Sequence, residues 1–597
     1  MPVTGGVPRR RGTDSPAKRG LLLAATTVAL RFGDTGMAHA QAALERHPVP
    51  LPAPRTPPSI GPAPPPTDED SRPLGATLEA MILLGAEDAA DTAAPAGGVD
   101  ASRLEARDRV DLRRRLTPFL AQPLSRKLIS RVQVAIVRHY RRVGRPFVAV
   151  SLPPQEITGG VLRVRVVEFR LGGKTVIGAS PRVARSVTGG VRARIGQPID
   201  AVTLEQDLDW LNRSPFRQVS AAFTPGAALA ETDLRLEVRS IRPWQVTAGY
   251  SNAGTRSSGY DRWFVGGQAG DILVPGSLVA YQVTASGDFW FANREPFGAV
   301  ADPRYVSHSL VIAAPLAPRQ DLTFSADYIQ SRTDSQDFTV RARTVEFTAT
   351  YRTALSNLVL LPGDLSLGVE ARDQQTDTDF GGVRVLRGGA QVGQLVVGWS
   401  DAWAAEGARQ SLTVTGHISP GDLTSRNSDA AFQAFTSGRV GQASYAYVDL
   451  SYGADVSLAA PWRYVAAINA RIADRPLIDT EQFAVGGEGG SRTYVYDDQS
   501  FDSGAVWRNE LRGPIVTAPQ GRFTPAISTA PYLFLDGAYA WDLHGGPHQF
   551  AGSTGLGLDW SLGARLSGGL AGGWSLADAA FTRAGQFKLM AKARLTF

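Results

Sequence analysis

The sequence contains no cysteine, and this absence excludes disulfide frameworks, Cys-ligated zinc or iron–sulfur centres and thiol catalysis. It also contains no apolar run of the roughly 18 to 20 residues that a membrane-spanning helix needs, so the chain can enter a bilayer only as strands. Charge is nearly balanced, because 62 basic and 56 acidic residues leave a net charge of +6. That balance gives no indication of nucleic-acid binding.

Recognisable catalytic signatures are also missing. Neither a Gly-x-Ser-x-Gly elbow nor a His-Glu-x-x-His helix occurs. Among only seven histidines, His544 and His548 are four residues apart, but they flank a Gly-Pro turn without a matching carboxylate spacing, so we expect no metal site. A barrel enzyme that assembles Ser, His and Asp from different strands stays open as a weaker alternative. We expect a protein that is not an enzyme and uses no cofactor.

What the sequence does have is length, glycine and an uneven distribution of tryptophan. Its 597 residues exceed one ordinary domain, which leaves several domains or one very large barrel. With 63 glycines and 39 prolines, the composition fits a turn-rich β protein. Ten of the eleven tryptophans follow residue 243. We therefore expect the parts before and after that residue to suit different surroundings.

The amino terminus has the layout of a secretory signal peptide over residues 1–40. Five basic residues precede the apolar run Leu21–Leu30, and the small-residue sequence Ala38-His39-Ala40 follows it. The alternative is a mis-started or disordered tail. Residues 41–76 are expected to form a proline-rich linker with room for only a short N-terminal helix, because prolines are dense between residues 48 and 73.

From residue 77 to residue 242 the hydrophobic period switches between 3.6 and 2, which predicts two compact α/β modules, at 77–172 and 173–242. Ser125 and Asp200 are each placed to cap a helix that two strands follow. A short sheet of this kind has an edge, whose N–H and C=O groups can pair with an extended polypeptide. The modules are therefore predicted to bind peptides. The predicted strands are 147–152 and 161–168 in the first module, and they contain Val219 and then Leu234 to Val238 in the second.

After Pro243 strict alternation replaces the helical period. Trp244, Val246 and Ala248 alternate with polar residues in the first segment, and the last segment alternates in the same way up to Phe597. A soluble sandwich also alternates. Segments of about ten residues, aromatics near their ends and charge on the polar face are instead typical of a barrel with lipid outside and water inside. Sixteen segments over residues 243–597 predict a mainly β protein with a 16-stranded antiparallel transmembrane barrel. They start near residues 244, 262, 277, 307, 322, 342, 364, 391, 409, 443, 462, 504, 531, 550, 564 and 587.

The longest connection, residues 474–503, follows the eleventh segment and carries a glycine-rich run. Glycine lets a chain follow a tight path, and the run does not fit a phosphate loop because the Lys-Ser/Thr ending is missing. On the thirteenth segment, alternation points Phe534 and Asp536 into the lumen, where a carboxylate can bind a guanidinium. We expect the loop to fold into the barrel and Arg492 to pair with Asp536; the alternative is a solvated loop arginine. The loop glycines of this prediction are Gly486, Gly487, Gly489 and Gly490.

Several of these segments resemble the TpsB transporters of two-partner secretion, which are haemolysin secretion and activation proteins of the ShlB/FhaC/HecB type. In the modules the resemblance rests on residues 152–168, on Leu208-Asp209-Trp210-Leu211-Asn212 and on Phe223-Thr224-Pro225-Gly226. It implies that the modules are POTRA domains. Phe169 departs from the family pattern, which usually shows glycine there.

In the barrel, Ser491-Arg492-Thr493-Tyr494 resembles the Val-Arg-Gly-Tyr/Phe loop motif of the same superfamily, and residues 534–538 resemble its Phe-x-Asp-x-Gly wall motif. Ser491, Thr493 and Ala538 differ from the usual residues. The resemblance implies that Arg492 and Tyr494 dock on Phe534 and Asp536, a contact that we call the latch. It also implies that the terminal Phe597 is a signal for the barrel assembly machinery.

Related transporters can carry an amino-terminal helix that plugs the pore. With cleavage after Ala40, only residues 41–47 precede the prolines, so a plug helix is expected to be short or absent.

The resemblance implies an outer-membrane protein whose periplasmic POTRA domains recognise a secreted TpsA-type exoprotein that the barrel then exports. The expected partners are that exoprotein, outer-membrane lipids and the barrel assembly machinery, and no nucleic acid. One alternative is a factor that inserts other barrels into the outer membrane. A passive porin or a barrel enzyme is a weaker alternative, since neither has an evident use for the two modules.

Overall fold

The computed structural model describes residues 45–48, 68–89, 97–157, 159–291, 302–335, 337–359, 361–405, 407–487, 489–519, 521 and 525–597. The expected signal peptide and most of the expected linker lie outside these residues. None of the helices in the described part of the chain is both long and apolar enough to cross a membrane.

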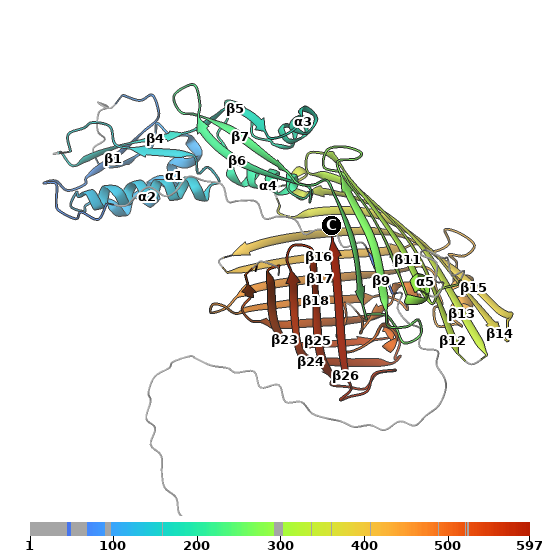
Figure 1. The fold of residues 1–597 in the computed structure, drawn as a ribbon. Coiled ribbons are helices and arrows are strands. Elements are labelled where there is room, and N and C mark those ends of the chain that lie inside the picture. The colour runs from blue at the N-terminus through green and yellow to red at the C-terminus, as the bar shows by residue number, and fades with distance from the viewer. Residues whose placement is uncertain are drawn as a thin grey trace, which may run out of the picture. The chain divides into compact units, whose positions relative to one another are not determined.

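The first module is a four-stranded sheet packed against two helices (Figure 1). The Ser125 hydroxyl accepts a hydrogen bond from the Leu128 N–H and so caps the second helix. Val132, Ile136 and Tyr140 recur along the buried face of that helix and pack on the sheet. The elements are β1 (Ala80–Leu84), β2 (Gly98–Asp100), α1 (Ala106–Leu116), the 3-10 turn η1 (Thr117–Phe119), α2 (Arg126–Arg142), β3 (Val148–Ser151) and β4 (Val161–Glu168), in the sheet order β2-β1-β4-β3.

The second module is a three-stranded sheet with two helices. Its elements are β5 (Arg170–Ile177), α3 (Pro181–Gly190), α4 (Ala201–Leu211), β6 (Arg217–Pro225) and β7 (Glu231–Ser240). The Asp200 side chain caps α4 by accepting a hydrogen bond from the Thr203 N–H. The sheet order is β5-β7-β6, so β5 and β6 are its edge strands. β5 begins at Arg170 and pairs with β7 in parallel.

Sixteen of the remaining strands close into an antiparallel barrel, which confirms the predicted fold class (Figure 1). Fifteen of the sixteen strands start within four residues of the expected position, and β15 starts eight residues early. The strands are β8 (Trp244–Ser251), β9 (Arg262–Gly270), β10 (Leu278–Ala285), β11 (Tyr305–Ala317), β12 (Gln320–Ser335), β13 (Phe338–Ala354), β14 (Asp364–Phe380), β15 (Val383–Ala405), β16 (Ala408–Ser419), β17 (Tyr445–Ser457), β18 (Arg463–Ala473), β21 (Ser503–Arg512), β23 (Ile527–Trp541), β24 (His548–Leu562), β25 (Leu566–Ser575) and β26 (Phe587–Thr596). A further short strand, β22 (Val516–Ala518), pairs with β23, and the connections carry α5 (Gly287–Phe291), η2 (Leu355–Asn357) and α6 (Asp429–Phe435).

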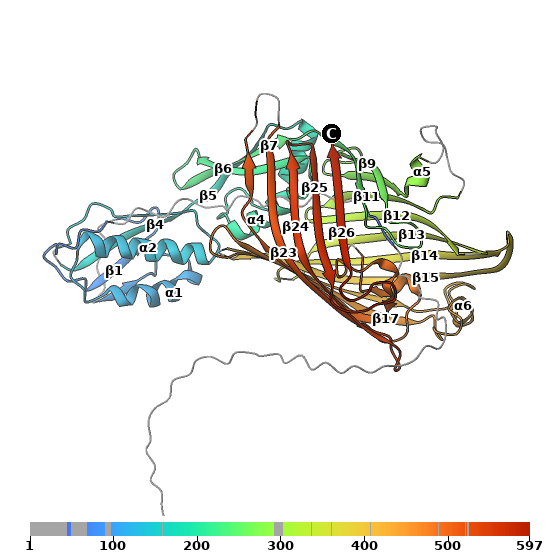
Figure 2. The same ribbon diagram turned by 60° about the horizontal axis from the view of Figure 1, so that its bottom comes forward.

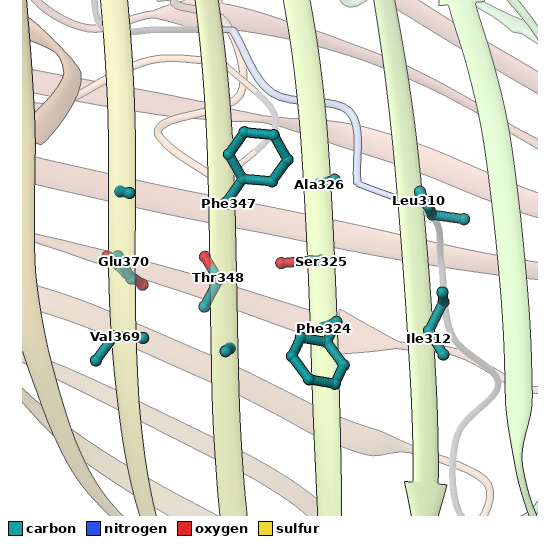
Figure 3. A pocket seen from close by; sticks show the side chains of 11 residues that line it. Leu310, Ile312, Phe324, Ser325, Ala326, Phe347, Thr348, Val369 and Glu370 are labelled. Atoms are coloured by element: carbon teal, nitrogen blue, oxygen red, sulfur yellow. The ribbon is translucent and has the colours of Figure 1, made fainter.

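The barrel wall has two chemically different faces. On β11 to β14 the outward side chains form a shallow apolar groove of about 260 Å³, walled by Phe324, Phe347 and Val369 (Figure 3). The intervening residues of the same strands are polar, such as Thr348 and Glu370. The groove is therefore part of an apolar outer belt, as alternation in an outer-membrane barrel requires.

Closure of the barrel depends on its first and last strands. β26 pairs with β8 over five residues, from Lys592 to Thr596. Phe597 continues the ladder, because its main chain exchanges two hydrogen bonds with Val246. Figure 2 shows β23, β24, β25 and β26 side by side in this part of the wall. The carboxyl-terminal residue is thus part of the seam that closes the barrel.

Candidate functional site

The connection between β18 and β21 folds into the barrel lumen. Its Tyr494 and Phe501 are fully buried and pack in one cluster with Ala538 of β23. Ala538 points inward, since its neighbour Tyr539 is exposed on the outer face and side chains alternate along a strand. The loop therefore lies against the inner wall. It contains η3 (Asp479–Glu481), β19 (Phe483–Ala484), η4 (Tyr496–Asp498) and β20 (Ser500–Phe501), and β19 pairs with β20.

Arg492 lies at the centre of a buried charge cluster on this wall. Its Nε is 3.1 Å from an Asp536 carboxylate oxygen of β23, and its Nη2 is 2.7 Å from Glu510 of β21. The Arg492 backbone N–H donates to the same Asp536 oxygen at 3.3 Å. The guanidinium carbon lies 4.6 Å from the centre of the Phe534 ring, within cation–π range. The structure thus brings Arg492, Asp536 and Phe534 together and adds Glu510, which the sequence prediction did not include.

The loop and the wall also meet through hydroxyl groups. Ser491 Oγ lies 2.8 Å from Ser553 Oγ of β24, and Ser553 in turn donates to Asp536 at 3.4 Å. Ser491 stands where the resembled family shows valine, so this polar contact depends on a residue in which the chain departs from the family pattern. In the strand register, Arg508 of β21 stands directly opposite Asp536 and adds a second cation beside the carboxylate.

Tyr494 binds a different part of the wall from Arg492. Its hydroxyl donates to the Ala577 carbonyl at 2.7 Å and accepts from the backbone N–H groups of Ala577 and Gly552. Its backbone carbonyl accepts a hydrogen bond from the Lys588 ammonium at 3.3 Å. Tyr494 thus connects the loop to β24, β26 and the β25–β26 connection, and none of these hydrogen bonds goes to Asp536.

Gly490 allows a bend of the loop to close tightly. A Cβ atom on Gly490 would lie 2.5 Å from the carbonyl oxygens of Val485 and Gly486, closer than two such atoms can come. The Ser491 N–H instead donates to the Val485 carbonyl at 2.8 Å. Gly490 is therefore required for the fold of the loop itself, whether or not Arg492 binds the wall.

A second buried charge cluster lies around Glu481 at the start of the loop, and sequence reasoning did not identify it. The Glu481 side chain is ion-paired with Arg372 of β14. Burial by itself raises the pKa of the Glu481 carboxyl, but Arg372 outweighs that effect and the pKa falls to about 2. The inward charges Glu370 and Arg372, two residues apart on one strand, are a sequence signal for this wall.

Residues 45–48 form neither helix nor strand, and three of them contact the lumen wall. The Glu45 carboxylate accepts two hydrogen bonds from Arg262 of β9, each at 2.7 Å, and the Tyr305 hydroxyl donates to the Glu45 carbonyl at 2.9 Å. Burial by itself raises the pKa of the Glu45 carboxyl, but Arg262 and His47 together lower it by more, so the pKa lies below its usual value. Arg46 binds Glu346 of β13 at 2.7 Å. The described segment just after the expected cleavage site therefore occupies the pore without forming a helix.

Asp479 predicts a pH dependence of the docked loop. Burial raises the pKa of its carboxyl from 3.8 to about 6, and Arg439, 3.7 Å away, offsets only part of the effect. As pH falls from about 6 to about 4, the folded state binds a proton that the unfolded state does not, so stability increases by about 1 to 3 kcal/mol. We expect thermal stability to be higher at pH 5 than at pH 7. Asp479→Asn should reduce this difference, whereas Asp474→Asn, at a half-exposed residue of the same loop, should retain it in full. An unchanged difference in Asp479→Asn would contradict the assignment.

No group of three or more His, Cys, Asp or Glu residues in the described ranges is arranged to hold a metal ion. His544 lies in the turn after β23, and His548 is the first residue of β24.

Comparison with known proteins shows which families resemble these parts of the chain. Residues 368–560 match the family model described as haemolysin secretion/activation protein ShlB/FhaC/HecB, and residues 96–168 match the model described as POTRA domain, ShlB-type. The outer membrane transporter CdiB of Dickeya dadantii (strain 3937) is 23% identical over 374 residues, which are 60% of this chain and 62% of that relative. The hemolysin transporter protein ShlB of Serratia marcescens is 28% identical over 110 residues, which are 17% of this chain and 19% of that protein.

A solved structure supports the same fold. CdiB from Escherichia coli superposes with a TM-score of 0.67 at 17% identity, over 89% of this chain and 92% of that chain. The match to the Dickeya relative spans 62% of its length, less than two thirds. Residues 368–560 thus resemble the ShlB/FhaC/HecB haemolysin secretion/activation proteins and residues 96–168 their POTRA domain, and the chain is an outer-membrane barrel protein whose POTRA domains lie in the periplasm.

Proposed function

We propose that the chain is an outer-membrane transporter that recognises an exoprotein through its POTRA domains and secretes it through the barrel. The observation that carries the proposal is the in-folded loop, which binds the wall through Arg492, Asp536 and Glu510. A passive pore has no need for a loop held by buried charges, because those charges pay a desolvation cost that apolar packing avoids. A loop held in this way can instead change position, since water in the lumen can replace its ionic contacts.

The proposed path begins at the edges of the POTRA sheets. An extended exoprotein segment adds as a strand to an edge such as β5 or β6, where backbone hydrogen bonds give affinity and side-chain pockets give selectivity. For the exoprotein to cross, the loop and the Glu45–His47 segment must leave their sites on the wall. Folding of the exoprotein outside the cell removes unfolded chain from the equilibrium and gives the transport its direction without a nucleotide.

Two further partners belong to the same proposal. The apolar outer belt contacts outer-membrane lipids. Phe597 is proposed as the signal that the barrel assembly machinery reads, which is supported by its position at the closing seam.

Deletion of the gene tests the proposed function. We expect one large secreted protein to disappear from the culture medium, because a dedicated transporter serves few substrates, and we expect full-length protein expressed in trans to restore it. Quantitative proteomics of the medium and of the outer membrane measures both effects. An unchanged medium would overturn the proposal, and a general loss of other barrels from the outer membrane would favour an assembly factor instead.

A further inference from the structure

The cluster around Glu481 holds the first half of the loop, several residues before Arg492. The Glu481 side chain is fully buried. Besides its ion pair with Arg372, it accepts hydrogen bonds from the Tyr447 hydroxyl of β17 at 2.8 Å and from Gln394 Nε2 of β15 at 3.3 Å. The Glu481 backbone carbonyl also accepts a hydrogen bond from Arg471 of β18. One loop residue is therefore bound to four wall strands.

The wall partners of Glu481 are held by further charges. Arg372 lies 3.2 Å from Glu346 and 3.0 Å from Glu370. Arg471 is paired with Asp449 at 2.6 Å. Arg46 of the amino-terminal segment binds Glu346 and donates to the Thr480 carbonyl at 3.1 Å, so it contacts both the wall and the loop. The cluster is preorganised, because its wall members keep their positions through bonds that do not involve Glu481.

Glu481 and Arg492 bind different arcs of the barrel. The wall partners of Glu481 come from β14, β15, β17 and β18, whereas those of Arg492 come from β21 and β23. A charged contact suits a part that must move, because water in the lumen can solvate the separated charges, whereas separated apolar surfaces would stay costly.

We propose that Glu481 is a positioning residue that anchors the loop to β14–β18 independently of Arg492, so that the lumen opens fully only when both contacts are released. The role of this anchor in export rests on the proposed function. The anchor itself is a property of the purified barrel and can be tested without an exoprotein.

The test uses the full-length protein in planar lipid bilayers, where the fraction of time spent in a high-conductance state reports release of the loop. Glu481→Gln, which keeps the shape and removes the charge, is expected to raise that fraction about tenfold. Glu481→Asp keeps the charge and should recover most of the closed state. If the two anchors act independently, their free energies add, so the fold-changes of Glu481→Gln and Arg492→Ala should multiply in the double variant.

Asp455→Asn is the matched control, because it removes an acid from a barrel ion pair with Arg463 that is partly exposed. It should behave as the unmodified protein. Tyr447→Phe removes one hydrogen bond to Glu481 and should show a smaller increase, which keeps the test decisive if Glu481→Gln does not assemble. The inference is overturned if Glu481→Gln matches the control, or if the double variant is no more open than Arg492→Ala alone. Loss of export with unchanged single-variant conductance would refute the anchor and leave the proposed function intact.

Discussion

Arg492→Ala is expected to reduce export at least tenfold while the barrel still assembles, because the proposed transport needs a loop that returns to its site on the wall as well as one that leaves it. The substitution removes the guanidinium that lies closest to Asp536, which is almost fully buried, whereas Glu510 keeps its ion pair with Arg512. Removing one partner from a buried ion pair costs about 3 to 5 kcal/mol, enough to change the population of the docked loop by a factor on the order of 100 or more. The wall strands keep their own ladder, so assembly should not depend on the latch.

The comparison of several variants separates the latch from general damage. Asp536→Ala should impair export as strongly, whereas Arg492→Lys should be intermediate, because a single ammonium cannot serve both carboxylates with the fork of a guanidinium. Arg463→Ala is the matched control, since Arg463 is half-exposed and surface pairs contribute about 0 to 1 kcal/mol. Export is measured as exoprotein in the medium, and assembly as heat-modifiable mobility of the barrel. Normal export by both Arg492→Ala and Asp536→Ala would remove the functional role of the latch.

The strands were predictable because alternation is a local signal that repeats every second residue. β15 shows where that signal ends. The sequence predicted a start near residue 391, but the strand begins at Val383. In the additional residues the outward positions are charged, with Arg384 and Arg387 facing Asp377 on β14. An apolar outer face marks only the part of a strand that meets lipid, so extensions beyond the belt cannot be found from hydrophobic periodicity.

The candidate site was predictable only in part. Alternation along β23 predicted that Phe534 and Asp536 face the barrel lumen, and Arg492 is the arginine of the glycine-rich run. The Glu481 cluster could not be found in this way, because Arg372 and Glu481 are 109 residues apart in the chain and no local pattern links them. Pairings across a barrel lumen depend on strand stagger and loop path, which are properties of the closed fold.

Gly555→Ala is expected to prevent assembly of the barrel, although it adds only one methyl group. Gly555 of β24 lies opposite Phe534 in the strand register. A Cβ atom at Gly555 would lie 2.1 Å from the Gly572 carbonyl oxygen of β25 and 2.7 Å from the Phe534 ring. A side chain can rotate away, but the Gly572 carbonyl belongs to the neighbouring strand, so the clash must separate β24 from β25. We expect a destabilisation of about 3 kcal/mol or more.

Gly416→Ala separates this effect from the general cost of replacing a barrel glycine. Gly416 lies on β16, where the nearest atom to an added Cβ is the Val397 carbonyl oxygen at 3.8 Å, an ordinary contact distance. Refolding into lipid vesicles, followed by the gel mobility of unheated samples, should give nearly normal yield for Gly416→Ala and almost none for Gly555→Ala. Phe534 can lie beside Arg492 because Gly555 has no side chain. If Gly555→Ala assembled normally, the latch would not depend on this close approach of the strands.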